Sequence, residues 1–193
     1  MVTNQREADY ISFYMSYKLK LIEFNSTEKY KNELVFLYSL LNVDTKDIIL
    51  DYGCGIGTSV ELLRSKNINA FGYDVYRWVD GDPEWFSSSF NMKFSHIYFM
   101  HSFAHIPNPA VMLDNLKESL QDDGIVTVIT PNKDWLDLMR DDNYKPDSTV
   151  VEHFTSETLN KIFVSNGYTV ICEGQFGCVK GNINERLFIK CRK

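Results

Sequence analysis

An acidic residue followed by three evenly spaced glycines is the part of this chain best suited to chemistry. Residues 48–58 read IILDYGCGIGT, so an apolar run leads to Asp51, and Gly53, Gly55 and Gly57 follow at every second position. Glycines allow a strand to turn sharply beneath a bound ligand before a helix begins. The carboxylate directly before the turn favours a ligand that carries positive charge over one that presents a pyrophosphate.

The glycine spacing also argues against a dinucleotide site. The dinucleotide fingerprint is G-x-G-x-x-G, and its last glycine would fall at Thr58 when counted from Gly53 and at Val60 when counted from Gly55. Neither position holds a glycine. A nicotinamide-dependent oxidoreductase, which only the type of fold suggests, is therefore the weakest alternative.

A second carboxylate lies at the end of the next apolar run. Asp74 ends NAFGYD, 23 positions beyond Asp51, and this spacing fits one intervening helix. The two hydroxyls of a ribose are both hydrogen-bond donors, and one ionised carboxylate can accept from both. The pattern therefore predicts that Asp74 recognises the sugar of a nucleoside.

The order D-x-G-x-G-x-G after an apolar strand resembles motif I of class I S-adenosylmethionine-dependent methyltransferases. Farther on, FSHIYFMHSFAHIPNPAVMLDNLKESLQDDGIVTVITPN resembles the small-molecule branch, which includes quinone, sugar and natural-product enzymes; the match covers residues 46–173. The resemblance implies that the cofactor is S-adenosyl-L-methionine, with its methionine part over the glycine turn and its ribose at Asp74. It also implies further cofactor contacts from residues beside these groups, from the next strand end and from a lid, namely Cys54, Val75, Met100, His101, Ser102 and Tyr14.

The resemblance further implies an α/β fold with a Rossmann-like, seven-stranded methyltransferase sheet. The strand order would be 3-2-1-4-5-7-6, with one antiparallel strand and helices on both faces. We expect a single methyltransferase domain over residues 1–193, in which residues 1–45 form an N-terminal helical cap and residues 46–193 form the core. In residues 75–93, the third strand and its helix are compressed into a stretch whose Gly81, Pro83 and serines argue against a long helix.

Two histidines are candidates for the catalytic base. A hydroxyl acceptor loses its proton as its oxygen is methylated, and a histidine with a pKa near neutrality is the simplest group to accept that proton. His105 lies in the turn after the cofactor strand, and His153 ends a long connection that begins after Pro131. The structural alternatives are a His105 ring bonded to the turn backbone and a His153 that braces the following helix.

Two departures from the family pattern leave a second function open. The family commonly has an acid at two positions where this chain has Ser95 and Ala104. A protein that binds S-adenosylmethionine but has lost catalysis is therefore an alternative. No metal site is expected, because the four cysteines form no C-x-x-C pair and His101 and His105 straddle a strand end.

Composition limits the partners of the chain. The 193 residues are 44% hydrophobic and 24% charged, and the formal charge is −6. With no long basic run, nucleic acid and anionic membranes are poor partners, and no segment has the length of a membrane span or the form of a signal peptide. We expect a cytoplasmic monomer or homodimer that methylates a partly apolar small-molecule substrate, at oxygen in preference to nitrogen or carbon.

Overall fold

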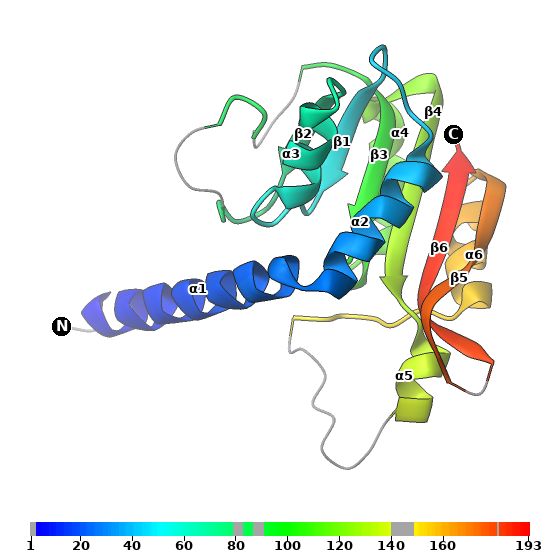
Figure 1. Cartoon of the computed structure of the whole chain (residues 1–193). Coiled ribbons are helices and arrows are strands. Elements are labelled where there is room, and N and C mark those ends of the chain that lie inside the picture. The colour runs from blue at the N-terminus through cyan, green and yellow to red at the C-terminus, as the bar shows by residue number, and fades with distance from the viewer. Residues whose placement is uncertain (1–2, 79–82, 87–90, 140–148, 181) are drawn as a thin grey trace.

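The fold is a single twisted sheet covered by helices (Figure 1). The computed structural model describes residues 3–78, 83–86, 91–139, 149–180 and 182–193, without the side chains of residues 3–14 and 180. The strands are β1 (Ile48–Tyr52), β2 (Asn69–Tyr73), β3 (Phe94–Met100), β4 (Leu120–Pro131), β5 (Thr169–Lys180) and β6 (Ile183–Arg192). The helices are α1 (Thr3–Ser26), α2 (Glu28–Leu41), α3 (Thr58–Ser65), the short 3-10 helix η1 (Phe103–His105), α4 (Pro109–Ser119), α5 (Lys133–Met139) and α6 (Ser156–Ser165).

The sheet brings the carboxyl ends of four parallel strands to one edge. Its order is β2-β1-β3-β4-β6-β5, in which β1, β2, β3 and β4 pair in parallel and β6 runs antiparallel to β4 and β5. In open α/β sheets, ligands bind outside the carboxyl ends of the strands. The loops after β1, β2 and β3 therefore meet where a ligand is expected.

The predicted seven-stranded sheet is wrong at one edge. Six strands are present in the described part of the chain, and the outer strand that would precede β2 in the order is missing. A single parallel bridge between Gly72 and Phe86 stands in its place. Pro83 lies three residues before this bridge and gives a local reason for the loss, because a proline cannot donate to a strand ladder. The expected neighbours of the remaining strands are found.

The helical pattern before residue 45 forms two helices of different character. Thr27 separates them, because its side chain accepts a hydrogen bond from the Tyr30 backbone and caps α2. Helix α2 lies along one face of the sheet, whereas α1 projects past the edge at which the parallel strands end (Figure 1). None of the helices within the described ranges has the length and apolar character needed to cross a bilayer.

The core has two parts, one on each face of the sheet. Alternation along β1 illustrates the division: Leu50 packs in the part covered by α4 and α6, and Ile49 packs in the part covered by α2 and α3. Both side chains are buried. This two-sided burial fixes the register of β1 and therefore the position of the turn that follows it.

Candidate functional site

The glycine turn is held tightly between two neighbouring parts of the protein. Gly53 and Gly57 have φ angles of 85° and 84°, which side chains rarely adopt. A Cβ at Gly53 would lie 2.3 Å from Cβ of Ser102, and one at Gly57 would lie 2.1 Å from the Trp85 ring. Because a Cβ at either position would clash with a neighbouring side chain of the protein, both positions require glycine. At Gly55 the nearest atom to such a Cβ would be a methyl carbon of Leu21, at 3.7 Å.

Asp51 places an incompletely bonded carboxylate beneath this turn. The residue is 2% exposed, and the Ser59 hydroxyl donates a hydrogen bond to its Oδ2. Its Oδ1 is buried and accepts no hydrogen bond from the described residues. Burial raises the pKa of Asp51 to about 7, and the negative charge of Asp74 adds to this rise, although interactions with the hydroxyls of Ser59 and Tyr98 oppose it. A cationic group placed at Oδ1 would satisfy the carboxylate and stabilise its ionised form.

Asp74 lies against the glycine turn, as its spacing from Asp51 suggests. The Gly55 backbone N–H donates to its Oδ2 at 2.9 Å, and the Tyr76 backbone and the Trp78 indole donate to its Oδ1 at 3.1 and 3.2 Å. Burial raises the pKa of this carboxyl, and these three donors together with the Val75 backbone partly offset the rise. Ribose hydroxyls bound at this carboxylate would share its oxygens with those donors or displace them. The neighbouring Val75 is exposed.

Two other predicted contacts are buried in the protein. Cys54 is buried in the turn, and burial raises the pKa of its thiol, so the thiol stays protonated and unreactive at neutral pH. Met100 ends β3 and is also buried. Both residues shape the edge of the sheet beneath the turn and expose little surface to a ligand.

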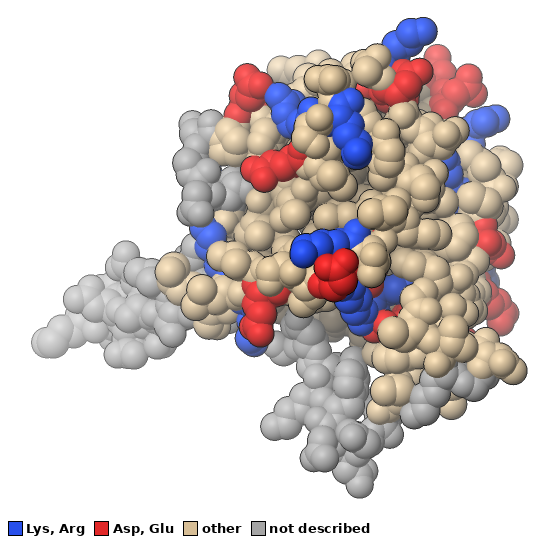
Figure 2. Space-filling model, viewed as in Figure 1, with Lys and Arg blue, Asp and Glu red and all other residues tan. Residues whose placement is uncertain are grey.

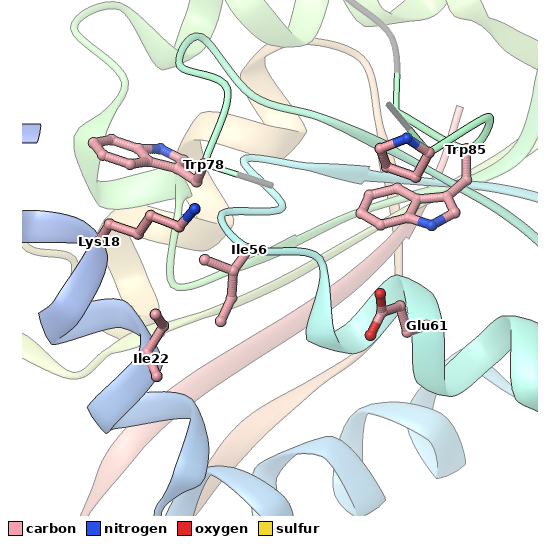
Figure 3. Close-up of a pocket in the computed structure, with 7 residues that line it drawn as sticks. Lys18, Ile22, Ile56, Glu61, Trp78 and Trp85 are labelled. Carbon is pink, nitrogen blue, oxygen red and sulfur yellow. The ribbon is translucent and has the colours of Figure 1, made fainter. Parts of the chain in front are cut away.

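The C-terminal half of α1 covers the glycine turn. The Asn25 side-chain amide donates to the Thr58 hydroxyl at 2.9 Å, which ties α1 to the start of α3. A cavity of about 240 Å³ lies beside the turn, where Lys18 and Ile22 of α1 and the Trp78 ring lie on one side and the Trp85 ring lies on the other (Figure 3). This volume is below the roughly 300–1,000 Å³ of typical ligand pockets. The side chain of Tyr14, the predicted lid residue, lies outside the described part of the structure.

The residues after β3 join this site from the other side. Ser102 touches the glycine turn, and its hydroxyl donates to the Tyr52 carbonyl oxygen. His101 precedes it with a φ of 63°, although it is not a glycine, and its backbone N–H donates to the Ile129 carbonyl at 2.9 Å. Such a strained backbone persists only where surrounding contacts enforce it, and these positions gather at functional sites.

The His101 ring belongs to a group of charged side chains that sequence reasoning missed, in which Glu33, Glu185 and Arg186 are buried and Lys29 is exposed. We call Lys29, Glu33, His101, Glu185 and Arg186 the charge cluster. Glu33 bonds Nε2 of His101 through Oε2 and accepts from Nε of Arg186 at 3.0 Å through Oε1. Arg186 also pairs with Glu185 at 3.1 Å, and Lys29 pairs with the same Glu185 oxygen. A sequence signal existed, because Glu33 interrupts the apolar face of α2.

The two predicted catalytic histidines lie in segments that are hydrogen-bonded to each other near the ends of β3 and β4. The His105 ring donates from Nδ1 to the Thr149 carbonyl at 3.0 Å, which is the backbone-bonded arrangement considered as its structural alternative. The neighbouring Ala104 carbonyl accepts from the backbone N–H groups of Val151 and Glu152. His153 follows directly and precedes Phe154, which bridges to the residue after β4. The long connection thus returns to the ligand edge of the sheet.

Two features of the described residues bear on binding of nucleic acid and of metal ions. On the face seen in Figure 2, basic and acidic side chains are interspersed, without a basic patch on the described residues of that face. A phosphate backbone would require such a patch. Within the described ranges, no group of three or more His, Cys, Asp or Glu side chains is placed to hold a metal ion.

Comparison with known proteins identifies a single class. A family model described as a methyltransferase domain matches residues 19–173. No curated protein sequence matches the chain. Several solved structures share its fold at low identity.

One is the 1,6-didemethyltoxoflavin-N1-methyltransferase of Burkholderia thailandensis, bound to 1,6-didemethyltoxoflavin and S-adenosylhomocysteine: it is 14% identical with a TM-score of 0.68, covering 96% of this chain and 86% of that one. Another is the magnesium protoporphyrin IX methyltransferase of Synechocystis with bound S-adenosylhomocysteine, which is 14% identical with a TM-score of 0.62, covering 84% and 81%. A third is a methyltransferase of Archaeoglobus fulgidus, which is 14% identical with a TM-score of 0.66, covering 92% and 99%.

Proposed function

The chain belongs to the family of methyltransferase domains, whose methyl donor is S-adenosylmethionine, and we propose that it methylates a small-molecule acceptor at a hydroxyl oxygen. The cofactor supplies an electrophilic methyl group on a sulfonium sulfur. Transfer is an in-line displacement, so the main task of the protein is to hold donor and acceptor on one axis and to exclude water. Residues of this chain must therefore anchor both ends of the cofactor.

The buried Oδ1 of Asp51 is the observation that carries the cofactor assignment. It accepts no hydrogen bond within the described residues, and it lies at the end of β1 directly before the glycine turn. The α-ammonium group of S-adenosylmethionine has the charge and donors that this oxygen requires. At the other end of the turn, the Asp74 carboxylate is an acceptor group for the ribose hydroxyls, which would share its oxygens with the present donors. The two carboxylates thus match the cationic and the sugar parts of one ligand.

Net charge and fold neighbours favour a small acceptor. A formal charge of −6 opposes binding to nucleic acid, which is itself strongly anionic. Two proteins of the same fold are named for small acceptors, a toxoflavin precursor and a magnesium porphyrin. We choose oxygen as the acceptor atom because histidines lie at the ligand edge. A histidine can accept the proton that a hydroxyl loses as its oxygen is methylated, whereas a neutral amine can be methylated before it loses a proton. His105 and His153 remain candidates for acceptor contact or proton transfer.

The second candidate function is a protein that binds S-adenosylmethionine without transferring its methyl group. The missing acid at Ser95 gives it little support, because Ser95 lies near the start of β3, at the opposite end of that strand from the turn, where its hydroxyl donates to Asp47 at 2.8 Å. Ala104 gives it more support, because that residue lies in η1, at the ligand edge. The distinction between the two functions must come from a transfer assay.

The assay follows the labelled methyl group of S-adenosylmethionine into a panel of phenols, sugars and quinol precursors. We expect label in a small organic product and an equal amount of S-adenosylhomocysteine. The Asp51→Asn variant serves as the matched control, and we expect it to transfer no label. Tight binding of S-adenosylhomocysteine without transfer to any acceptor in the panel would favour the binding protein. Label in added RNA or protein would overturn the small-molecule assignment.

A further inference from the structure

We propose that His101 accepts the proton of the acceptor hydroxyl during methyl transfer, and that Glu33 is the positioning residue that sets the tautomer of its ring. This inference rests on the proposed function, because it presupposes a hydroxyl acceptor beside a bound sulfonium. It adds a specific base to that function. Its foundation is the geometry of the charge cluster together with the place of His101 at the end of β3.

The charge cluster fixes which nitrogen of His101 carries a proton. Burial raises the pKa of Glu33, but the hydrogen bond to His101 and the positive charges of Arg186 and Lys29 hold that pKa below its ordinary value. Glu33 is therefore ionised and can only accept hydrogen bonds. Because its Oε2 faces Nε2 of His101, that nitrogen must be the donor. In the neutral ring, Nδ1 is then the nitrogen that can accept a proton.

Burial keeps the ring neutral before the reaction. It lowers the pKa of His101, while the hydrogen bond to Glu33 and its negative charge act in the opposite direction. Arg186 and Lys29 also lower this pKa. With His101 neutral, the positive charges of Lys29 and Arg186 balance the negative charges of the two glutamates in the cluster. A proton taken up at Nδ1 creates a cation whose hydrogen bond to the ionised Glu33 becomes an ion pair, which stabilises the product of proton transfer.

The position of His101 suits this role. The residue follows β3 directly, and the next residue, Ser102, touches the glycine turn at Gly53. The ring remains 18% exposed, and Nδ1 makes no hydrogen bond with any residue that the structure describes. Phe24 of α1 contacts the ring edge-on, with centroids 5.7 Å apart. His101 therefore lies between the cofactor turn and the helix that covers it.

The proposed step balances in atoms and electrons. An oxygen lone pair of the acceptor forms the new O–C bond, and the C–S bond breaks with its electron pair moving to sulfur. The sulfonium becomes the neutral thioether of S-adenosylhomocysteine. The O–H bond breaks with its pair remaining on oxygen, and the proton moves to Nδ1 of His101. Release of that proton to solvent restores the neutral ring.

A purely structural cluster that ties α2 to the sheet is the alternative, and a pair of phenols distinguishes the two. His101→Gln keeps an N–H donor toward Glu33 and removes the base. With 4-methylphenol, which is protonated at neutral pH, we expect the variant to lose at least about a hundredfold in turnover, the scale of general-base catalysis. With 4-nitrophenol, which is substantially ionised at neutral pH, we expect a loss below about tenfold. Equal losses on both phenols would overturn the proposal.

Matched variants separate the base from general damage. His96→Gln changes a buried histidine near the start of β3, at the opposite end of that strand from His101. This variant should leave the ratio of turnover on the two phenols unchanged. S-adenosylhomocysteine should bind His101→Gln within about threefold of the wild type, because this histidine contributes a proton acceptor and no charge to the cofactor. If His105→Gln or His153→Gln altered the phenol ratio and His101→Gln did not, the base would be that other histidine.

Nuclear magnetic resonance of ¹⁵N-histidine tests the assignment without turnover, and it decides the matter if neither phenol is methylated. In the complex with S-adenosylhomocysteine at about pH 7.5, we expect a neutral His101 ring protonated at Nε2, and a mixture of tautomers in Glu33→Gln. A ring protonated at Nδ1, or one that stays cationic at this pH, would overturn the proposal. Failure of the cofactor to bind at all would instead contradict the proposed function.

Discussion

Ser59 donates its hydroxyl to Oδ2 of Asp51, eight residues earlier in the chain, and Oδ1 of the same carboxyl accepts nothing from the described residues. One oxygen of the carboxyl group is thus held by α3. A buried oxygen such as Oδ1 costs free energy until a donor reaches it.

Asp51→Asn should separate stability from cofactor binding. The pKa of Asp51 rises from 3.8 to about 7 in the fold, so the folded protein keeps a proton between these values that the unfolded chain has released. Asp51 therefore lowers the free energy of unfolding as pH rises through this window, and the full cost is present above it. At about pH 8, Asn should raise the free energy of unfolding by on the order of 1–4 kcal/mol, measured by urea denaturation without ligand.

The affinity of the Asp51→Asn variant for S-adenosylhomocysteine should fall more than a hundredfold, or about 3–5 kcal/mol. Unchanged affinity would refute the role of Oδ1.

The affinity for S-adenosylhomocysteine should depend on pH below neutrality. A bound ammonium group favours the ionised form of Asp51, so binding below a pKa of about 7 must release a proton. The dissociation constant should fall by up to about tenfold for each pH unit as pH rises toward 7 and should then level off. 5′-Methylthioadenosine, which lacks the amino-acid part, is the matched control ligand. A pH dependence of the dissociation constant that both ligands share would be assigned to Asp74, which we propose to bind the ribose common to both. If the two ligands showed no difference in pH dependence, the assignment of Asp51 to the ammonium group would be contradicted.

Asp74→Ala should weaken binding of S-adenosylhomocysteine by about 1–3 kcal/mol, the cost of leaving ribose hydroxyls unpaired. The measurement is isothermal titration calorimetry. Trp78→Phe is the matched control, because it removes one donor to Asp74 and retains the carboxylate. The control should change the affinity by less than about fivefold. If both variants behaved like the wild type, the ribose would be held elsewhere.

Gly53→Ala and Gly55→Ala should differ in stability although the glycines are two residues apart. At Gly53 the new methyl would meet Cβ of Ser102 at 2.3 Å with φ at 85°, and we expect a loss of about 2–5 kcal/mol in the free energy of unfolding. At Gly55 the nearest atom is 3.7 Å away, so the left-handed backbone alone should cost about 1–2 kcal/mol. Adding Ser102→Gly to Gly53→Ala should recover part of the loss in thermal melts. Equal losses at both glycines would show that the contact with Ser102 does not matter.

Local patterns predicted the parts of the site that a short segment builds. The glycine turn follows β1 as expected, and one intervening helix brings Asp74 to within hydrogen-bond distance of the Gly55 backbone. Gly81, Pro83 and the serines of residues 75–93 argue against a long helix there, whereas the resemblance predicts a third strand. The described residues of this stretch contain no such strand, and Pro83, which cannot donate to a ladder, gives a local reason.

The charge cluster could not be read from local patterns in the same way. Glu33 is 68 residues from His101 and 153 residues from Arg186, so only the sheet order brings the three together. The one local sign was a carboxylate on the apolar face of α2, beside Leu34 and Leu37. Such a residue needs a buried partner, but the sequence does not say which cation or ring provides it. The contact between Glu33 and the His101 ring, which only the tertiary structure shows, makes this predicted cofactor contact a candidate base as well.

A crystal structure of the complex with S-adenosylhomocysteine tests the central claim most directly. We expect the α-ammonium group within hydrogen-bond distance of Oδ1 of Asp51, the ribose hydroxyls at Asp74, and the sulfur toward the end of β3. A ligand bound elsewhere, or a turn that stays filled by protein side chains at saturating ligand, would contradict the account.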